Sequence, residues 1–156
     1  MLKVSKAQNA DVMTITLSGT IDDGDDFDSL ISSVGPKAVF DTAKISRINS
    51  IGVKNWIKFF ETLTKKKVSF AFDSLSSALV EQVNMIRNFA CGGEIRSIIA
   101  VFRCEKCEHN VDQRLTTKSL IESKFVLPTV KCPKCGQNAE FDDMPEECFR
   151  FLQEPQ

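Results

Sequence analysis

The sequence has no long apolar run. None of its apolar stretches approaches the roughly 18 to 20 residues that a membrane-spanning helix needs. Its first residues, MLKVSKAQNADV, also lack the apolar segment of a secretory signal peptide. We therefore expect a cytoplasmic protein that does not enter a membrane and whose cysteines are reduced.

An excess of charge of one sign is also missing. The formal net charge is −1 although 26% of the 156 residues are charged, so the chain as a whole is not attracted to nucleic acid or to an anionic membrane. Hydrophobic residues make up 42% of the chain, which is enough for a packed core and excludes a disordered chain. The length fits one ordinary domain and a small second one.

The usual signatures of catalysis are absent as well. The chain has a single histidine, His109, and the cysteines near it in the sequence, Cys104 and Cys107, belong to a C-x-x-C pair. No glycine-rich phosphate-binding loop is present. The sequence therefore predicts a protein that is not an enzyme.

Residues 38–60, AVFDTAKISRINSIGVKNWIKFF, are typical of a buried strand, a tight loop and an amphipathic helix. The apolar run 38–40 predicts a strand that reaches the surface at Asp41. Asn49 and Ser50 are candidate helix caps, with Ser50 favoured. Gly52, in the first turn, permits close approach of another backbone or of a partner. Apolar residues then recur at three- and four-residue spacing, at Val53, Trp56, Ile57, Phe60 and Leu63.

The flanking segments alternate between the two kinds of element. Apolar alternation predicts strands at 12–17, 68–72 and 95–102. Helical spacing predicts one helix with Phe27, Leu30, Ile31 and Val34 on its inner face and another with Leu79, Val83, Ile86 and Phe89. Such alternation predicts an α/β fold, a mixed sheet covered by helices.

An acidic loop precedes the first of these helices, with Asp22, Asp23, Asp25, Asp26 and Asp28. Aspartates at a helix start favour its positive N-terminal dipole, so we interpret the loop as a solvated cap. The alternative is a divalent cation site, but the spacing lacks the residue order and closing glutamate of a calcium loop.

Two segments carry a resemblance to a known family. LSGTID at 17–22 and VFDTAKISRINSIGV at 39–53 resemble the STAS domain of anti-sigma factor antagonists and of the cytosolic ends of sulfate transporters. The similarity covers about the first hundred residues. In the family, a strand ending in aspartate leads to a D-S-S-G or D-S-A-G type loop that opens a helix. Here Asn49 replaces the aspartate, and Ile51 stands where bacterial antagonists have the phosphoacceptor serine.

The resemblance implies a non-enzymatic regulatory module of a bacterial signalling pathway. It would dock to a protein partner, of the anti-sigma type, through the loop and helix at 49–58. The residues implied in partner binding are Asn49, Ser50, Ile51, Gly52, Lys54 and Lys58. Because Ile51 has no hydroxyl, the family's phosphorylation switch is not expected there, and Ser50 is the remaining candidate phosphorylation site.

Two C-x-x-C pairs dominate the last third of the chain. Cys104 and Cys107 form the first pair, Cys132 and Cys135 the second, with 24 residues between the pairs. Each pair can turn two thiolates toward one centre, and two pairs complete a tetrahedral zinc site. The form resembles a zinc ribbon. Four protein ligands leave no open coordination position, which favours structural zinc over iron or a catalytic dithiol.

The sequence thus predicts a STAS-like domain at 1–97 and a small four-cysteine zinc ribbon with a short C-terminal helix at 98–156. The ribbon residues include eight Lys or Arg against ten Asp or Glu, which disfavours the alternative of a nucleic-acid-binding or transcription-associated zinc-ribbon protein. His109 is expected to be an exposed ribbon residue, and Cys91 and Cys148 small buried hydrophobes. Met144, Cys148, Phe151 and Leu152 share the face of the last helix, which is expected to pack on a domain.

Overall fold

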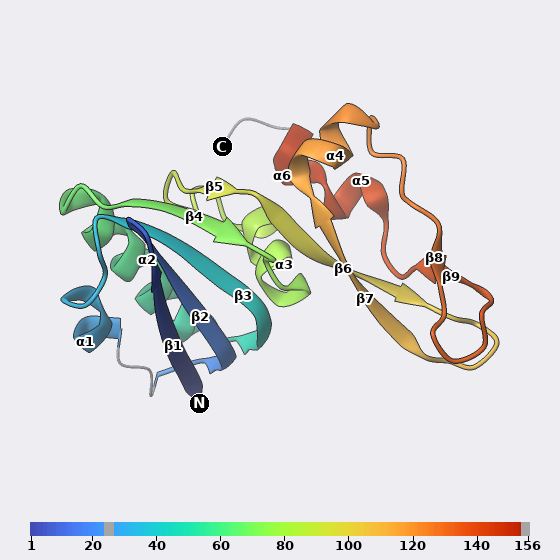
Figure 1. Cartoon of the computed structure of the whole chain (residues 1–156), viewed down its shortest axis with the longest axis horizontal. Helices are drawn as coiled ribbons and strands as arrows, with labels where there is room; N and C mark the ends of the chain where they lie inside the picture. Colours follow the sequence, from blue (N-terminus) through green and yellow to red (C-terminus); the bar gives the residue numbers. More distant parts are fainter. Residues whose placement is uncertain (24–26, 154–156) are drawn as a thin grey trace.

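The computed structural model describes residues 1–23 and 27–153, which form two β-sheets joined at one corner (Figure 1). The first sheet has the strand order β1-β2-β3-β4-β5. Its strands are β1 (Leu2–Asn9), β2 (Val12–Ile21), β3 (Lys37–Ile48), β4 (Ser69–Asp73) and β5 (Glu94–Ile95). β1 pairs antiparallel with β2, and the other neighbours are parallel. The predicted α/β class is confirmed, while an arrangement specific to STAS domains stays a prediction.

Three helices connect the parallel strands: α1 (Phe27–Ile31), α2 (Ser50–Lys65) and α3 (Ser77–Met85). α2 follows the predicted apolar spacing, because Trp56, Phe60 and Leu63 are fully buried, whereas Val53 and Ile57 are partly buried. Among the described residues, no helix is long and apolar enough to cross a bilayer.

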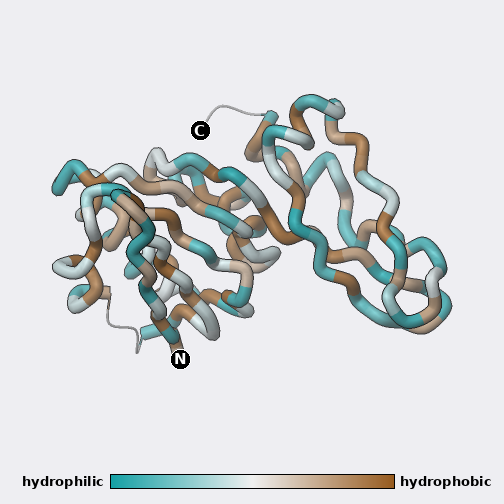
Figure 2. Tube along the Cα trace, in the orientation of Figure 1, coloured by the Kyte–Doolittle hydropathy of each residue, from teal (hydrophilic) through white to brown (hydrophobic). Residues whose placement is uncertain are grey.

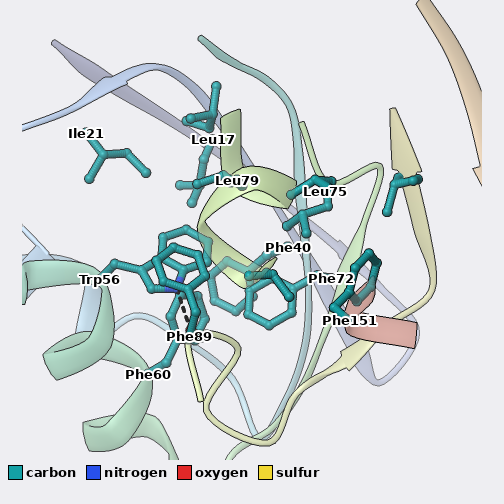
Figure 3. Close-up of a cluster of buried hydrophobic side chains, with 14 of the residues drawn as sticks. Leu17, Ile21, Phe40, Trp56, Phe60, Phe72, Leu75, Leu79, Phe89 and Phe151 are labelled. Atoms are coloured by element: carbon teal, nitrogen blue, oxygen red, sulfur yellow. Dashed lines mark hydrogen bonds between the residues drawn. The ribbon is translucent and has the colours of Figure 1, made fainter. Parts of the chain in front are cut away.

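Trp56 lies at the centre of the aromatic side chains that pack between α2 and the first sheet, within one core cluster that extends to the second sheet (Figure 3). Its indole stacks on Phe89 with ring centres 5.1 Å apart and planes 7° apart, and its N–H donates to the Phe89 carbonyl at 2.9 Å. The predicted extension of α3 to Phe89 is wrong, because this helix ends at Met85. Phe89 instead reaches the core from the following turn, which passes through a left-handed residue at Asn88 (φ 63°).

The first sheet differs from the sequence prediction at several strands, and the predicted strand 95–102 is wrong because it divides into β5 in the first sheet and β6 in the second. The sequence does not predict β1, because all but one of its residues are exposed and it has no apolar alternation. β3 does not end at Asp41 but continues to Ile48, and β2 continues through Gly19. Register shifts on either side of Ser18 and Gly19 let the two long strands stay paired to their ends.

The second sheet has the order β7-β6-β9-β8 and consists of two hairpins. Its strands are β6 (Ser97–Arg103), β7 (Asn110–Thr116), β8 (Val130–Lys131) and β9 (Asn138–Phe141). The helix α4 (Thr117–Glu122) lies between β7 and β8 in sequence. Figure 2 shows apolar residues where the chain passes from the first sheet into β6, and there Ile98 forms a bridge with Leu75. The domain boundary at 97/98 stays a prediction.

Two short helices, α5 (Pro145–Cys148) and α6 (Arg150–Gln153), end the described chain. The predicted single helix is wrong, since it breaks at Phe149. This break turns both Phe149 and Phe151 inward, and both are buried, whereas Met144 is 57% exposed. Asn84 of α3 holds the pair of helices: its side-chain amide donates to the Cys148 carbonyl at 2.8 Å and accepts from the Phe151 N–H at 2.9 Å. The prediction that this segment packs on a domain is therefore confirmed.

Candidate metal centre and partner-binding surface

The four cysteines of the two C-x-x-C pairs come together at one end of the second sheet. All four sulfur atoms lie within 4.8 Å of one another. The closest contacts join the two pairs, with 3.4 Å between the sulfurs of Cys104 and Cys135 and 3.3 Å between those of Cys107 and Cys132. Tetrahedral zinc with bonds of about 2.3 Å would place its sulfur ligands about 3.8 Å apart. The cluster therefore has the size and the donor atoms to hold a metal ion.

Each pair lies in the turn of a hairpin. Cys104 and Cys107 follow β6, and Cys132 and Cys135 follow β8. The Cys104 N–H donates to the His109 carbonyl at 2.9 Å, and the Cys132 N–H donates to the Gln137 carbonyl at 2.8 Å. These equivalent bonds close the two turns in the same way and fix the spacing of the sulfurs.

The residue after each pair adopts a left-handed backbone, with φ of 58° at Glu108 and 75° at Gly136. Gly136 adopts this conformation without strain, whereas Glu108 does so at a cost. The glycine at the end of CPKCG therefore predicts the left-handed turn, whereas the glutamate at the end of CEKCE does not.

The backbone favours a thiolate at the first cysteine of each pair. Burial raises the pKa of Cys132, but the N–H groups of its own turn and the neighbouring thiols outweigh burial and lower this pKa to about 6. The pKa of Cys104 is also lowered, chiefly by the Cys107 N–H. The contact with Cys132 raises the pKa of Cys107 to about 12. Because metals bind thiolates, the turns prepare one ligand each for a metal.

Comparison with known proteins does not identify a family for this chain. A scan against protein-family models and a search of curated proteins found no match. The resemblance to the STAS domain thus depends on the two segments at 17–22 and 39–53 and on the α/β architecture.

The remaining metal-ligating candidates lie outside the cluster. His109 is half-buried rather than exposed, and it serves the turn through its carbonyl. Burial raises the pKa of Cys91 to about 11 and that of Cys148 to about 12, which disfavours a thiolate at both positions at neutral pH. Within residues 1–23 and 27–153, no other group of three or more such side chains gathers. Asp25 and Asp26 of the acidic loop, for which a cation site is the alternative to a solvated cap, lie outside the described residues.

The residues implied in partner binding lie at the start of α2, on a face that we call the α2 surface. Ser50, Lys54 and Lys58 are exposed, and Ile51 is 49% exposed. Ile51, Lys54 and Lys58 follow the three- and four-residue spacing of one helix face. Gly52 is buried beneath them, so it supports the surface and does not belong to it. A small hollow of about 220 Å³ adjoins this face and is lined by Thr20, Ile21, Asp22, Arg47 and Asn49.

Asn49, and not Ser50, caps α2. The Asn49 side chain accepts from the Gly52 N–H at 2.8 Å, while Ser50 is the first helical residue. The sequence-based preference for Ser50 is wrong because the chain enters the helix one residue earlier. No hydrogen bond of the Ser50 side chain occurs in the described structure, so its hydroxyl is open to solvent.

We expect Asn49→Ala to lower the free energy of unfolding by about 1 kcal/mol, since it removes the acceptor of the Gly52 N–H. Ser50→Ala should change it by less than about 0.5 kcal/mol, as for other exposed sites. Urea unfolding of both variants measures this. An equal loss in Ser50→Ala would contradict the assignment of the cap.

A polar cluster joins the two sheets at the end of β4. Arg114 of β7 donates to Asp73 at 2.7 Å and to the Ser74 hydroxyl at 3.2 Å. Ser97 of β6 donates to the same Asp73 carboxylate. Burial raises the pKa of Asp73, but the bonds from Ser97 and Arg114 outweigh burial and lower it below 3.8. The ionised carboxylate therefore ties both hairpin strands to the first sheet.

Because the pKa of Asp73 is depressed by folding, its contribution to stability is present above about pH 4 and is lost as pH falls through the folded pKa. We expect Arg114→Met to lower the free energy of unfolding by less than about 1 kcal/mol at neutral pH, since Arg114 and Asp73 are each more than a third exposed. The difference should shrink in acid. Urea unfolding of both proteins across pH measures this difference. Protonation of the four clustered cysteines in acid affects both proteins equally, so it cancels in the comparison. A difference that grows in acid would contradict the assignment.

Proposed function

We propose that this protein is a non-enzymatic, cytoplasmic interaction module of the anti-sigma factor antagonist type, with zinc at Cys104, Cys107, Cys132 and Cys135. The single observation that carries the docking proposal is the exposed α2 surface. It combines an apolar side chain, Ile51, with the ammonium groups of Lys54 and Lys58. Partner surfaces commonly combine an apolar anchor with a charged rim.

The chemistry of this face favours an acidic partner. None of the three ion pairs in residues 1–23 and 27–153 involves Lys54 or Lys58. Both ammonium groups are therefore available to carboxylates across an interface, where complementary charge speeds association and selects the partner. Ile51 would pack into the centre of that contact.

Zinc is the metal that this donor set favours. Four thiolates suit a soft, tetrahedral ion, and two cysteines, Cys104 and Cys132, are buried, which keeps water from half of the shell. A site with four protein ligands has a structural role, because no coordination position stays open for a substrate. The proposed zinc would hold the two hairpin turns together.

The docking proposal is tested by capture from a lysate of the source cells. The wild-type chain is expected to retain a protein that Ile51→Asp and Lys54→Glu each lose. Lys118→Glu, an exposed charge reversal on α4, is the matched control and should retain it. Near-identical melting temperatures would show that all three variants are folded. Partners that depend on RNA would instead favour the nucleic-acid alternative, and equal loss in Lys118→Glu would overturn the α2 surface.

Ser50 is the candidate position for regulation. Its hydroxyl is exposed and is not used as a cap, and phosphate there would lie at the positive end of α2 and inside the α2 surface. Ile51 cannot be phosphorylated. Phosphate mapped to Ser50, with partner binding lost in Ser50→Asp but kept in Ser50→Ala, would show a switch at this residue. Binding kept in both variants would show that the surface is not switched there.

A further inference from the structure

A groove of about 730 Å³ lies between α3 and the C-terminal segment, with β6 as its floor. Figure 1 shows these elements meeting at the junction of the two sheets. It is separate from the α2 surface and from the cysteine cluster, since no residue of those two sites lines it. Its lining includes Glu81 and Met85 on one side and Asp142 and Glu147 on the other.

The walls of the groove are held at a fixed spacing. Asn84 of α3 bonds to the backbone of both Cys148 and Phe151. The Arg150 guanidinium donates to the Asn84 carbonyl at 3.1 Å, so the one basic side chain among the described lining residues is already hydrogen-bonded to α3. The groove is therefore a preformed feature, which lowers the cost of ordering a bound segment.

The groove is acidic. Glu81, Asp142, Asp143 and Glu147 line it, and all four are exposed. No ion pair of the described residues involves any of them. Carboxylates on two facing walls attract a chain that carries positive charges on both of its sides.

The floor offers backbone groups as well. The Ile99 N–H donates to the Leu75 carbonyl at 2.8 Å, and the Val101 carbonyl accepts from the Asp142 N–H at 2.9 Å. In a strand, the N–H and carbonyl of one residue point to the same side. The Ile99 carbonyl and the Val101 N–H therefore face the gap between these two bonds, where an extended chain can pair with β6.

The groove also has an apolar contact at its rim. Met85 lines it and is 66% exposed, and the flexible thioether of methionine adapts to varied apolar side chains. Acidic walls, an open strand edge and an exposed methionine together match a segment that alternates basic and apolar residues.

We propose that this groove binds an extended basic segment of a partner protein, which pairs its backbone with β6 at 99–101 and places lysine or arginine side chains against the acidic walls. The proposal does not depend on the α2 surface, so the failure of either leaves the other standing.

The test uses the full zinc-loaded chain and a short fluorescent peptide of alternating lysine and valine. We expect saturable binding by fluorescence anisotropy and shifts of the Ile99 and Val101 amide signals. The double variant Glu81→Lys with Glu147→Lys should weaken binding at least about tenfold. The double variant Glu61→Lys with Glu122→Lys has the same charge change at exposed acids outside the groove and should keep the affinity within about twofold.

Several results would overturn the proposal. These are an absence of saturable binding, equal binding of a glutamate and valine peptide, equal weakening in both double variants, or amide shifts confined to residues outside the groove. The melting temperature of each variant shows whether it is folded. If the Glu81 and Glu147 variant unfolds, Asp142→Lys replaces it, with Glu122→Lys alone as the control of equal charge change, because Asp142 is exposed and uses only its backbone in the sheet.

Discussion

Cys132→Ser is expected to reduce the proposed zinc content from one ion per chain to near zero and to unfold the hairpins of the second sheet. The binding free energy of structural zinc in zinc-finger peptides is about 10 to 16 kcal/mol at neutral pH, which exceeds what so small a core supplies. Cys132 is 2% exposed and contacts Cys107, so its replacement removes a buried ligand from the proposed zinc site. Metal analysis of protein purified without chelator measures the first effect.

The single tryptophan allows the second effect to be localised. Trp56 is buried against Phe60, Phe72 and Phe89 and not next to the cysteines, so its fluorescence should stay close to that of the wild type while the amide signals of β6–β9 lose their dispersion. Cys148→Ser is the matched control, since Cys148 is outside the cluster, and it should keep the metal. Lower pH should weaken metal binding, because protons compete for the thiolates. Metal retained in Cys132→Ser, or absent from the wild type, would contradict the site.

Gly52→Ala is expected to lower the free energy of unfolding by about 3 kcal/mol, at the upper end of overpacking effects. A Cβ at Gly52 would lie 2.2 Å from the Ile21 carbonyl oxygen and 2.7 Å from its carbon. That carbonyl is fixed, since it accepts from the Asn49 N–H at 3.2 Å. The start of α2 would have to move away from β2, and the α2 surface would move with it.

Gly35→Ala is the control for the intrinsic effect of adding a methyl group. Its Cβ would meet the Met13 methyl at 3.9 Å, an ordinary contact, so its stability should change by less than about 1 kcal/mol. Urea unfolding of both variants provides the comparison. A Gly52→Ala protein as stable as Gly35→Ala would show that the close packing of α2 on β2 is not required.

The sequence is sufficient to predict the structure wherever the spacing of neighbouring residues determines it. The apolar spacing of α2 predicts the burial of Trp56, Phe60 and Leu63, because a helix shows one face to the core, although it does not single out Phe59, which is also buried. The two C-x-x-C pairs predict the four ligands of the cluster, because each turn directs its two sulfurs to one side, while the contacts between the pairs come from the packing of the two hairpins. The sequence also indicates that Gly52 permits close approach, although it leaves open whether a backbone or a partner lies there.

Tertiary structure decided what depends on distant segments. β1 has no periodicity of its own, and its place comes from pairing with β2. The hydrogen bonds among Asp73, Ser97 and Arg114 connect three strands. The Asn84 side chain bonds to the backbone of residues more than sixty positions away. Such contacts leave no local signal, because a single polar residue in a strand or helix looks like any solvated side chain. The acidic groove exists for the same reason only after α3, β6 and the C-terminal helices have packed together.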